Sequence, residues 1–241
     1  MTVYPSGESG GIADPVYLRV RERIRSEILS GVFPPGSRLK SADLSKRYKV
    51  SQMPIREALQ MLQGEGLVTV LPNRGASVRA VDNRFIENMY DIRGVIDGLL
   101  VRRACKLMND SEIFELHGVQ AKYEEAAGAG QLDASLELNK EFHHIIYVAA
   151  DNPEAMSMLE CHWGLVDSLR RTFGFGQERI QEIISEHRQL LRALDRRDEE
   201  LATRIALLHC EQAKADLLRQ RENALGADPG KLRNIRKGRT A

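Results

Sequence analysis

The spacing of apolar residues along the chain changes twice. Up to about residue 64, and again from about residue 83, apolar residues recur every three to four positions, which is the period of amphipathic helices. Between these regions, residues 67–71 and 76–81 are short β-prone runs separated by Pro72-Asn73-Arg74-Gly75, which predicts a hairpin. The pattern therefore predicts a mainly α protein with one small β element.

Three helices are predicted before the hairpin. The first has its apolar stripe at Val16, Val20, Ile24 and Ile28 and ends at Gly31. Ser41 is expected to cap a short second helix through about Tyr48, and Ser51 to cap a third with Pro54 in its first turn. The third helix has an apolar stripe at Ile55, Ala58, Leu59 and Leu62. Its opposite side carries Gln52, Arg56, Gln60 and Gln63.

Two short helices joined by a tight turn and followed by a hairpin describe a winged helix-turn-helix domain, whose second helix enters a major groove. Arginine and glutamine on that helix are able to hydrogen-bond guanine and adenine edges. Arg74 at the hairpin tip is placed to reach a phosphate or the minor groove. The simpler interpretation of each residue alone is a solvated helix face and an ordinary turn.

Helical periodicity then continues almost unbroken from Asn83. The first stripe is predicted at Phe85, Met89, Ile92, Ile96 and Leu99. Further helices are expected at about 110–127, 132–150, 153–173, 177–195 and 198–222, with breaks rich in Gly, Asn and Pro. Six or more helices in one domain predict an all-α bundle.

The net charge of +1 changes meaning when it is divided along the chain. Residues 1–82 hold 12 Lys/Arg against 8 Asp/Glu, residues 83–225 hold 18 against 25, and residues 226–241 hold 5 against 1. We therefore expect a flexible N-terminus at 1–13, a DNA-binding domain at 14–82, a helical effector and dimerisation domain at 83–225, and a basic, disordered tail at 226–241. The absence of a secretory or membrane-spanning pattern predicts a cytoplasmic protein. The three separated cysteines suggest buried thiols in a reducing compartment.

Polar residues interrupt the inward stripes of three predicted helices. Asn139 and His143 lie one turn apart on the first, while His187 and His209 interrupt the other two. Three neutral imidazoles and one oxygen ligand make a first shell suited to a divalent transition metal. Histidines satisfied within the core or at the surface are the alternative, and that interpretation is adopted for His117, His144 and His162.

The N-terminal stretch resembles the DNA-binding domain of GntR-family transcriptional regulators. The matching segments are G-V-F-P-P-G-S-R-L (31–39), V-S-Q-M-P-I-R-E-A-L (50–59), L-x-x-E-G-L-V (62–68) and P-N-R-G-A-x-V (72–78). The resemblance implies that Arg38 and Arg56 contact the operator. It also implies that Ser51, Gln52 and Pro54 open the recognition helix, and that Asn73, Arg74 and Gly75 form the wing. Relatives usually carry Arg where this chain has Gln52, so the operator is expected to differ at that base.

The second domain resembles the FCD ligand-binding domain of the FadR branch. The resemblance rests on Asn139-Lys-Glu-Phe142-His143, Glu186-His187 and His209, with Asn139 standing where Asp is usual. It implies a divalent metal, zinc first and nickel or manganese as alternatives, beside a small carboxylate effector. Arg93 is the first candidate to anchor the acid and Arg170 the second, although a surface charge is the simpler interpretation of each.

These features together predict a homodimeric, effector-controlled regulator that binds a palindromic operator and no membrane. A metal-dependent hydrolase or lyase with a nucleic-acid-binding appendage is the main alternative. It lacks support, because no motif supplies a general base. A constitutive architectural DNA binder is the third possibility, and it would show no effector dependence.

Overall fold

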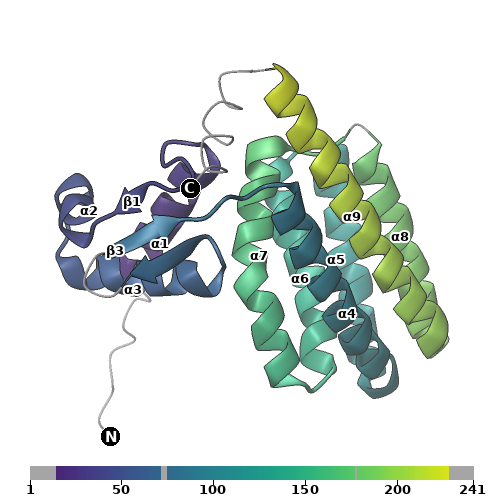
Figure 1. The fold of residues 1–241 in the computed structure, drawn as a ribbon. Coiled ribbons are helices and arrows are strands. Elements are labelled where there is room, and N and C mark those ends of the chain that lie inside the picture. The colour runs from purple at the N-terminus through teal and green to yellow at the C-terminus, as the bar shows by residue number, and fades with distance from the viewer. Residues whose placement is uncertain (1–14, 72–74, 177, 228–241) are drawn as a thin grey trace, which may run out of the picture.

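The computed structural model describes residues 15–71, 75–176 and 178–227, which form two domains side by side (Figure 1). Within these residues the chain forms nine helices and one three-stranded sheet. The sheet and the first three helices belong to the N-terminal domain, and the other six helices form the second. The prediction of a mainly α protein with a small winged domain and a six-helix bundle is confirmed.

The N-terminal domain begins with three helices close to their predicted bounds. These are α1 (Val16–Leu29), α2 (Ser41–Tyr48) and α3 (Gln52–Gly64). α1 is followed by Gly31 in the left-handed region at φ +80°, as expected for a helix-ending glycine. The apolar stripes of α1 and α3 meet in a core that includes Ile24, Ile55 and Leu62, all fully buried.

The expected hairpin is formed by β2 (Val68–Leu71) and β3 (Gly75–Val78), with Leu71 opposite Gly75. A third strand, β1 (Arg38–Leu39), pairs antiparallel with β3 and gives the order β1-β3-β2. Two residues are too short to show an alternating pattern, so this strand was not predicted. A Cβ atom at Gly75 would lie 2.2 Å from the Leu39 carbonyl oxygen, so this close approach of β1 and β3 requires a glycine.

The predicted helix caps are only partly right. Ser41 is not a cap: the N-cap residue of α2 is Lys40, and its side chain makes no capping hydrogen bond to a described residue. The reason is that β1 holds the backbone extended through Lys40, so Ser41 is already helical. Ser51 does occupy the N-cap position of α3, but its side chain likewise accepts no capping hydrogen bond from the described residues.

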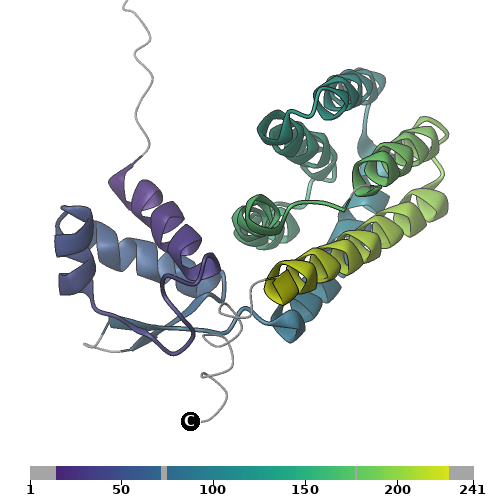
Figure 2. The ribbon, with the colours of Figure 1, turned by 90° about the horizontal axis from the view of Figure 1, so that it is seen from above.

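The second domain consists of six helices. They are α4 (Asn83–Leu107), α5 (Asp110–Gly128), α6 (Leu132–Ala149), α7 (Pro153–Phe173), α8 (Arg179–Asp195) and α9 (Glu199–Ala227). α4 and α9 lie against each other although more than 90 residues separate them, and Figure 2 shows the pair along one side of the bundle. Leu100, Leu116, Phe142 and Ile146 are among the fully buried residues of its core.

The stripe predicted for α4 is partly wrong. Met89 is buried, but Ile92 and Leu99 are 55% and 48% exposed. The inward face of α4 carries Arg93 and Asp97 in their place, 4% and 1% exposed. A pattern that assigns charged residues to solvent cannot identify a buried face that contains two of them.

The two domains share one apolar core. Leu165 and Leu169 of α7 and Leu217 of α9 belong to the same buried cluster as Val20 and Ile24 of α1. Both ribbon views place α7 between α1 and the remainder of the bundle (Figures 1 and 2). The N-terminal domain is therefore packed against the helical domain through α7 and α9.

Three further expectations concern the cysteines, membrane-spanning segments and the two ends of the chain. Cys105 and Cys210 are free and buried, as predicted, and Cys161 is not among the side chains described. Within the described part of the chain, no helix combines the length and apolar character needed to cross a membrane. The predicted flexible N-terminus and basic tail lie outside the described residues.

Candidate functional site

Three histidines from three helices meet inside the bundle. His143 of α6, His187 of α8 and His209 of α9 each offer a ring nitrogen, and these atoms lie within 4.8 Å of one another. His143 and His187 are 3% and 1% exposed, and the ring of Phe142 stacks on His187 at 4.1 Å between centroids. The stripe positions that singled out these residues therefore correspond to one cluster.

The atoms around this cluster include unused hydrogen-bonding groups. Nδ1 of His143, Nε2 of His187 and Oδ1 of Asn139 are buried and lack a partner among the described residues. Burial lowers the pKa of both His143 and His187 well below the ordinary value, and His209 adds to the effect in each case. The two imidazoles are therefore neutral near pH 7, and their free nitrogen lone pairs suit a divalent transition metal.

Two of the three rings are oriented by partners that the sequence analysis did not identify. Nδ1 of His187 donates to Oε1 of Gln120 at 2.9 Å, and Nδ1 of His209 donates to Oε2 of Glu186 at 2.6 Å. Each bond places the proton on Nδ1 and leaves Nε2 as the unprotonated nitrogen. In metal sites a second residue commonly fixes the tautomer of a histidine ligand in this way. The available signal was Gln120 itself, a polar residue between Val119 and Tyr123 on the buried side of α5.

Glu186 is held in turn by Arg179. The guanidinium donates to both carboxylate oxygens, at 2.7 and 2.9 Å. Burial opposes ionisation of Glu186, but the hydrogen bonds from His209 and Arg179 outweigh it and lower its pKa. With both oxygens engaged, this carboxylate orients a ring and is not free to act as a general base.

A cavity of about 130 Å³ adjoins the histidines, well above the 10–15 Å³ that one water needs. His143, His209 and Asn139 line it together with Arg93. Another part of the lining is apolar and belongs to one small cluster: Tyr123, Ala127, Phe175, Ile180 and Ile183. The cavity therefore has a polar part beside the histidines and an apolar wall formed by α5, α8 and the α7–α8 loop.

Arg93 is a buried residue, not the surface charge that was its simpler interpretation. Its guanidinium lies over the Trp163 ring at 4.2 Å, and its Nη1 has no hydrogen-bond partner among the described residues. Burial alone would lower the pKa of Arg93, but neighbouring Tyr147 and Asp97 outweigh it and raise the pKa. A permanently charged group with an unused donor therefore lines the cavity.

Arg170 is also buried and lines the cavity, but its donors are already engaged. It donates to Asp216 Oδ2 at 2.5 Å and to the carbonyls of Ala213 and Gly174. Its guanidinium also lies over the Phe175 ring at 4.4 Å. These contacts suit a role in fixing the α7–α8 loop against α9.

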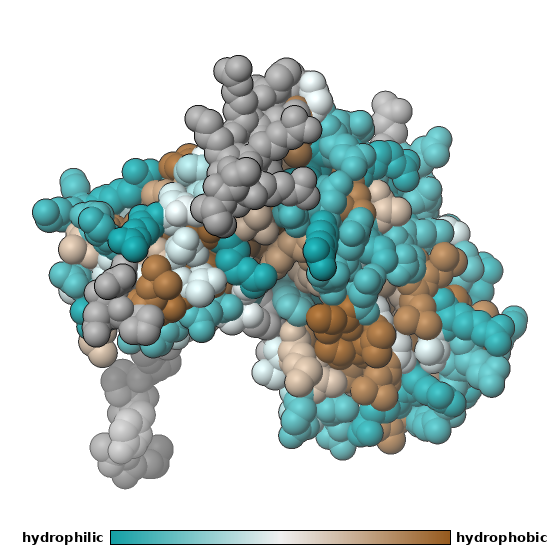
Figure 3. All heavy atoms as spheres, in the orientation of Figure 1, coloured by the Kyte–Doolittle hydropathy of each residue, from teal (hydrophilic) through white to brown (hydrophobic). Residues whose placement is uncertain are grey.

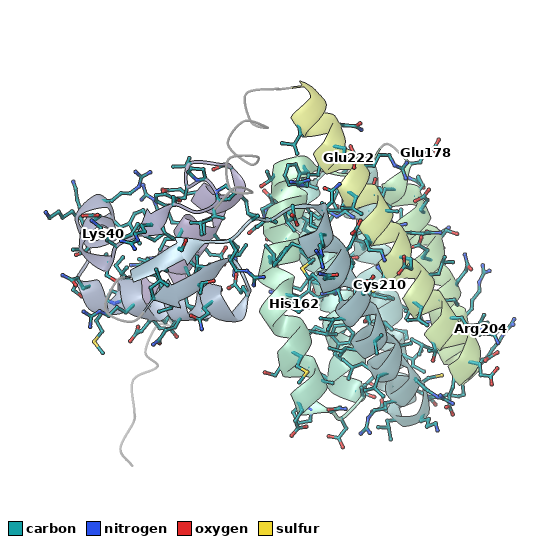
Figure 4. The ribbon with its side chains drawn as sticks, in the orientation of Figure 1. Lys40, His162, Glu178, Arg204, Cys210 and Glu222 are labelled. Atoms are coloured by element: carbon teal, nitrogen blue, oxygen red, sulfur yellow. The ribbon has the colours of Figure 1, made fainter. Side chains whose placement is uncertain are left out.

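A small buried polar cluster lies next to Arg93. Tyr147 donates to one oxygen of Asp97, and the Cys210 thiol donates to the other at 3.0 Å. Figure 4 places Cys210 on α9, where its Cβ lies near Gly94 of α4. Asp97 is therefore hydrogen-bonded through both oxygens and balances part of the Arg93 charge.

The remaining histidines differ from one another. His117 is exposed and pairs with Asp195, and His144 is exposed. His162 on α7 (Figure 4) is partly buried, and burial together with Arg93 lowers its pKa. None of the three belongs to the described cluster.

Four of the residues predicted to contact DNA lie around one concavity of the N-terminal domain. Arg38 of β1, Gln52 and Arg56 of α3, and Gly75 of β3 line it, and Lys40 and Gln60 join them. Arg38, Lys40 and Arg56 are exposed, and none of them forms an ion pair within the described ranges. This face therefore presents unused cationic and amide groups beside the N-terminal half of α3.

The other predicted DNA contacts are elsewhere. Ser51 and Pro54 line a separate hollow with Val16 and Tyr17 of α1. Gln63 on the same helix is partly engaged, because its Oε1 accepts from the Val70 backbone N–H. Asn73 and Arg74 lie outside the described residues.

A winged helix-turn-helix domain packed on a helical domain with an internal cavity defines a DNA-binding transcriptional regulator. The chain belongs to the GntR family: the family described as "Bacterial regulatory proteins, gntR family" matches residues 16–78, and the "FCD domain" matches residues 88–212. The family and the relatives below are transcriptional regulators, not enzymes.

Relatives match over most of both chains. The HTH-type transcriptional regulator YdhC of Bacillus subtilis is 28% identical, covering 87% of this chain and 96% of its own. The HTH-type transcriptional repressor RspR of Escherichia coli is 27% identical, with 82% and 87% covered. The solved structure of E. coli McbR/YncC shares the fold, with a TM-score of 0.67 at 24% identity and coverage of 86% and 98%.

Proposed function

We propose that this regulator is a homodimer whose operator affinity is set by a carboxylate bound beside a divalent metal in the helical domain. The observation that carries the proposal is the convergence of unused groups at one cavity. Three histidine nitrogens lie within 4.8 Å of one another. Asn139 and Arg93 line the same cavity, and neither Asn139 Oδ1 nor Arg93 Nη1 has a partner among the described residues. Buried polar groups without partners cost free energy, so a ligand that satisfies them is favoured.

The donor set fits a metal of the zinc, nickel or manganese class. His143, His187 and His209 would supply nitrogen and Asn139 an amide oxygen, while Gln120 and Glu186 hold two of the rings in place. A bound divalent ion would supply positive charge to an acid in the cavity. Asn139 brings no negative charge, so the affinity is expected to be lower than with a carboxylate.

The cavity lining favours a particular class of acid. Arg93 offers an unused donor to a carboxylate, and the wall formed by Tyr123, Phe175, Ile180 and Ile183 offers apolar surface. A hydroxyl group that faces this wall would lack a hydrogen-bond partner there, so we expect the body of the ligand to be apolar on this side. The effector we propose is therefore a monocarboxylate with a compact aliphatic or aromatic body.

One exposed apolar face supports a dimer on a palindromic operator. Ile92, Val95 and Leu99 of α4 and Leu208 of α9 are between 48% and 71% exposed, and Figure 3 shows apolar side chains gathered on this face. Exposed apolar patches of this kind mark protein interfaces. Two copies joined across this face would present two recognition helices to a two-fold symmetric site.

The metal is tested on the full chain purified without added metal, by elemental analysis of the wild type and two variants. His187→Ala removes a ligand, whereas His117→Ala removes an exposed histidine outside the cluster. We expect bound metal in the wild type and in His117→Ala and its loss in His187→Ala. Equal metal content in all three proteins would contradict the assignment.

The effector is tested by a thermal-shift screen in the metal-loaded chain, because a ligand of the native state raises stability by mass action. Pentanoate and benzoate should raise the melting temperature more than gluconate does at equal concentration. Arg93→Met should abolish the rise for every acid. If gluconate stabilises the protein and the apolar acids do not, the acid class is wrong but the carboxylate site remains.

A further inference from the structure

Arg25, near the end of α1, is buried where three elements meet. Its guanidinium donates to both oxygens of Glu65, through Nε at 2.8 Å and through Nη2 at 2.5 Å. Arg25 and Glu65 are 2% and 4% exposed. Glu65 directly follows α3, so this ion pair ties α1 to the end of the recognition helix.

The third element at this contact is α7 of the helical domain. A Cβ atom at Gly164 would lie 2.7 Å from Nη1 of Arg25 and 2.8 Å from Nη2, closer than real Cβ contacts. The guanidinium therefore occupies the space that a side chain on α7 would need. It is not free to move aside, because Glu65 engages it through both oxygens.

The neighbouring residue of α7 belongs to the cavity. Trp163 lines the cavity, and its ring centroid lies 5.7 Å from that of His143. The Arg93 guanidinium lies over the same tryptophan ring, 4.2 Å from its centroid. Successive residues of a helix point about 100° apart, so Trp163 and Gly164 lie on two sides of α7. Figure 4 labels His162, the residue before Trp163, in the middle of this helix.

We infer that α7 couples the cavity to the recognition helix through Trp163, Gly164 and the Arg25–Glu65 pair. A ligand that moves Trp163 moves Gly164 against Arg25, and Glu65 passes the displacement to the end of α3. Linkage is reciprocal, so operator binding also changes the surroundings of Trp163. Arg25 is a positioning residue in this scheme, which relies on the proposed function only for the identity of the cavity ligand.

The coupling has a built-in reporter, because Trp163 is the only tryptophan in the sequence. We would titrate the full chain with an operator fragment selected in vitro and record tryptophan emission. The wild type should change its emission, and Gly164→Ala should lose more than about half of that change while still binding DNA. Gly118→Ala is the matched control, since it adds a methyl group to helix α5 where no described atom of another element lies within 4 Å.

A second variant protects the test against a folding defect. Glu65→Gln keeps the shape of the side chain but removes its charge, so the hold on Arg25 weakens without adding an atom to the contact. It should reduce the emission change as Gly164→Ala does. Wild-type emission that ignores the operator, or a Gly164→Ala protein that responds like the wild type, would overturn the inference. If Gly164→Ala does not fold, an undiminished response in Glu65→Gln overturns it equally.

The coupling is also tested from the cavity to the operator, with zinc as the only ligand. The operator Kd of the wild type and of Gly118→Ala should change about tenfold between metal-free and zinc-loaded protein. In Gly164→Ala it should change less than about twofold, with the zinc content unchanged. Zinc content separates this inference from the proposed function: failure of every protein to bind zinc contradicts the metal site, and the emission experiment then decides the coupling.

Discussion

Asn139 is the residue at which the candidate metal site departs most from an acidic ligand set. Its Oδ1 is buried, without a partner in the described part of the chain, and on the same helix as His143. Asn139→Asp should raise zinc affinity about tenfold, because a carboxylate adds charge without changing the shape of the side chain. Competition against a chelator measures this. Asn223→Asp, exposed on α9, adds the same charge and should change nothing; equal effects in the two variants would indicate general electrostatics.

Gln120 has a role that only the fold reveals. Its bond to Nδ1 of His187 fixes the ring, and loss of such a partner typically weakens metal binding about 10–100-fold. We expect Gln120→Ala to fall in this range in the same chelator assay, while Gln189→Ala at the exposed side of α8 keeps wild-type affinity. An unchanged zinc affinity in Gln120→Ala would show that packing alone holds His187.

The sequence predicted the members of the histidine cluster better than their partners. His143, His187 and His209 interrupt apolar stripes on their own helices, so periodicity alone singles them out. Gln120 and Glu186 each hydrogen-bond a histidine on another helix. Periodicity within one helix cannot predict a contact between two helices. Arg93 and Arg170 were predicted as anchors for the acid, with a surface charge as the simpler interpretation of each; aromatic rings and carboxylates inside the bundle allow both to be buried.

At the scale of elements, the wing depends on one glycine. Gly31 and Gly75 both have positive φ, but only at Gly75 would an added Cβ atom lie 2.2 Å from a carbonyl oxygen. Gly31→Ala should cost about 1–2 kcal/mol for the left-handed backbone. Gly75→Ala should cost more and weaken operator binding, because β1 must move away from β3. Urea denaturation of both variants measures the difference, and equal losses would contradict it.

The recognition helix gives a second prediction at this scale. Arg56 is exposed on α3 beside Gln52 and Arg38, and a good bidentate base contact is worth about 1–3 kcal/mol of discrimination. Arg56→Ala should abolish preference for the operator over unrelated DNA in a competition assay. Lys46→Ala on α2 removes an equal charge away from this face and should keep that preference. Retained preference in Arg56→Ala would refute the contact.

The long helices and the hairpin were predicted well, and the errors lie in one two-residue strand and one helix start. The five helices whose bounds were predicted, α5 to α9, begin and end within a few residues of expectation, apart from α9, which extends to Ala227. Strand β1 and the start of α2 were missed because both depend on pairing with β3, a contact distant in the sequence.

At the scale of the whole molecule, the exposed face of α4 is expected to join two copies. Val95 is 71% exposed at its centre, and Phe114 on α5 is 81% exposed elsewhere. Val95→Asp should shift the protein toward monomer in sedimentation analysis, because a carboxylate at a closed interface loses its water. Phe114→Asp should not. Monomeric wild type, or a fully dimeric Val95→Asp protein, would contradict this assignment.

The division of charge along the chain predicts two domains with different tasks, and that division stays a prediction; the family matches cover residues 16–78 and 88–212. Periodicity could not predict that the domains share a core. Leu165 and Leu169 of α7 look like ordinary inward residues of a bundle, yet they pack with α1.

This shared core has a consequence for how the protein is made. The N-terminal domain leaves the ribosome first, but its core is completed by Leu169 of α7 and by Leu217 of α9, the last helix of the described residues. The face of α4 that packs against α9 likewise stays uncovered until α9 has been synthesised. An unfinished or truncated chain therefore carries a DNA-binding domain with an uncovered apolar side, a form that chaperones and proteases recognise.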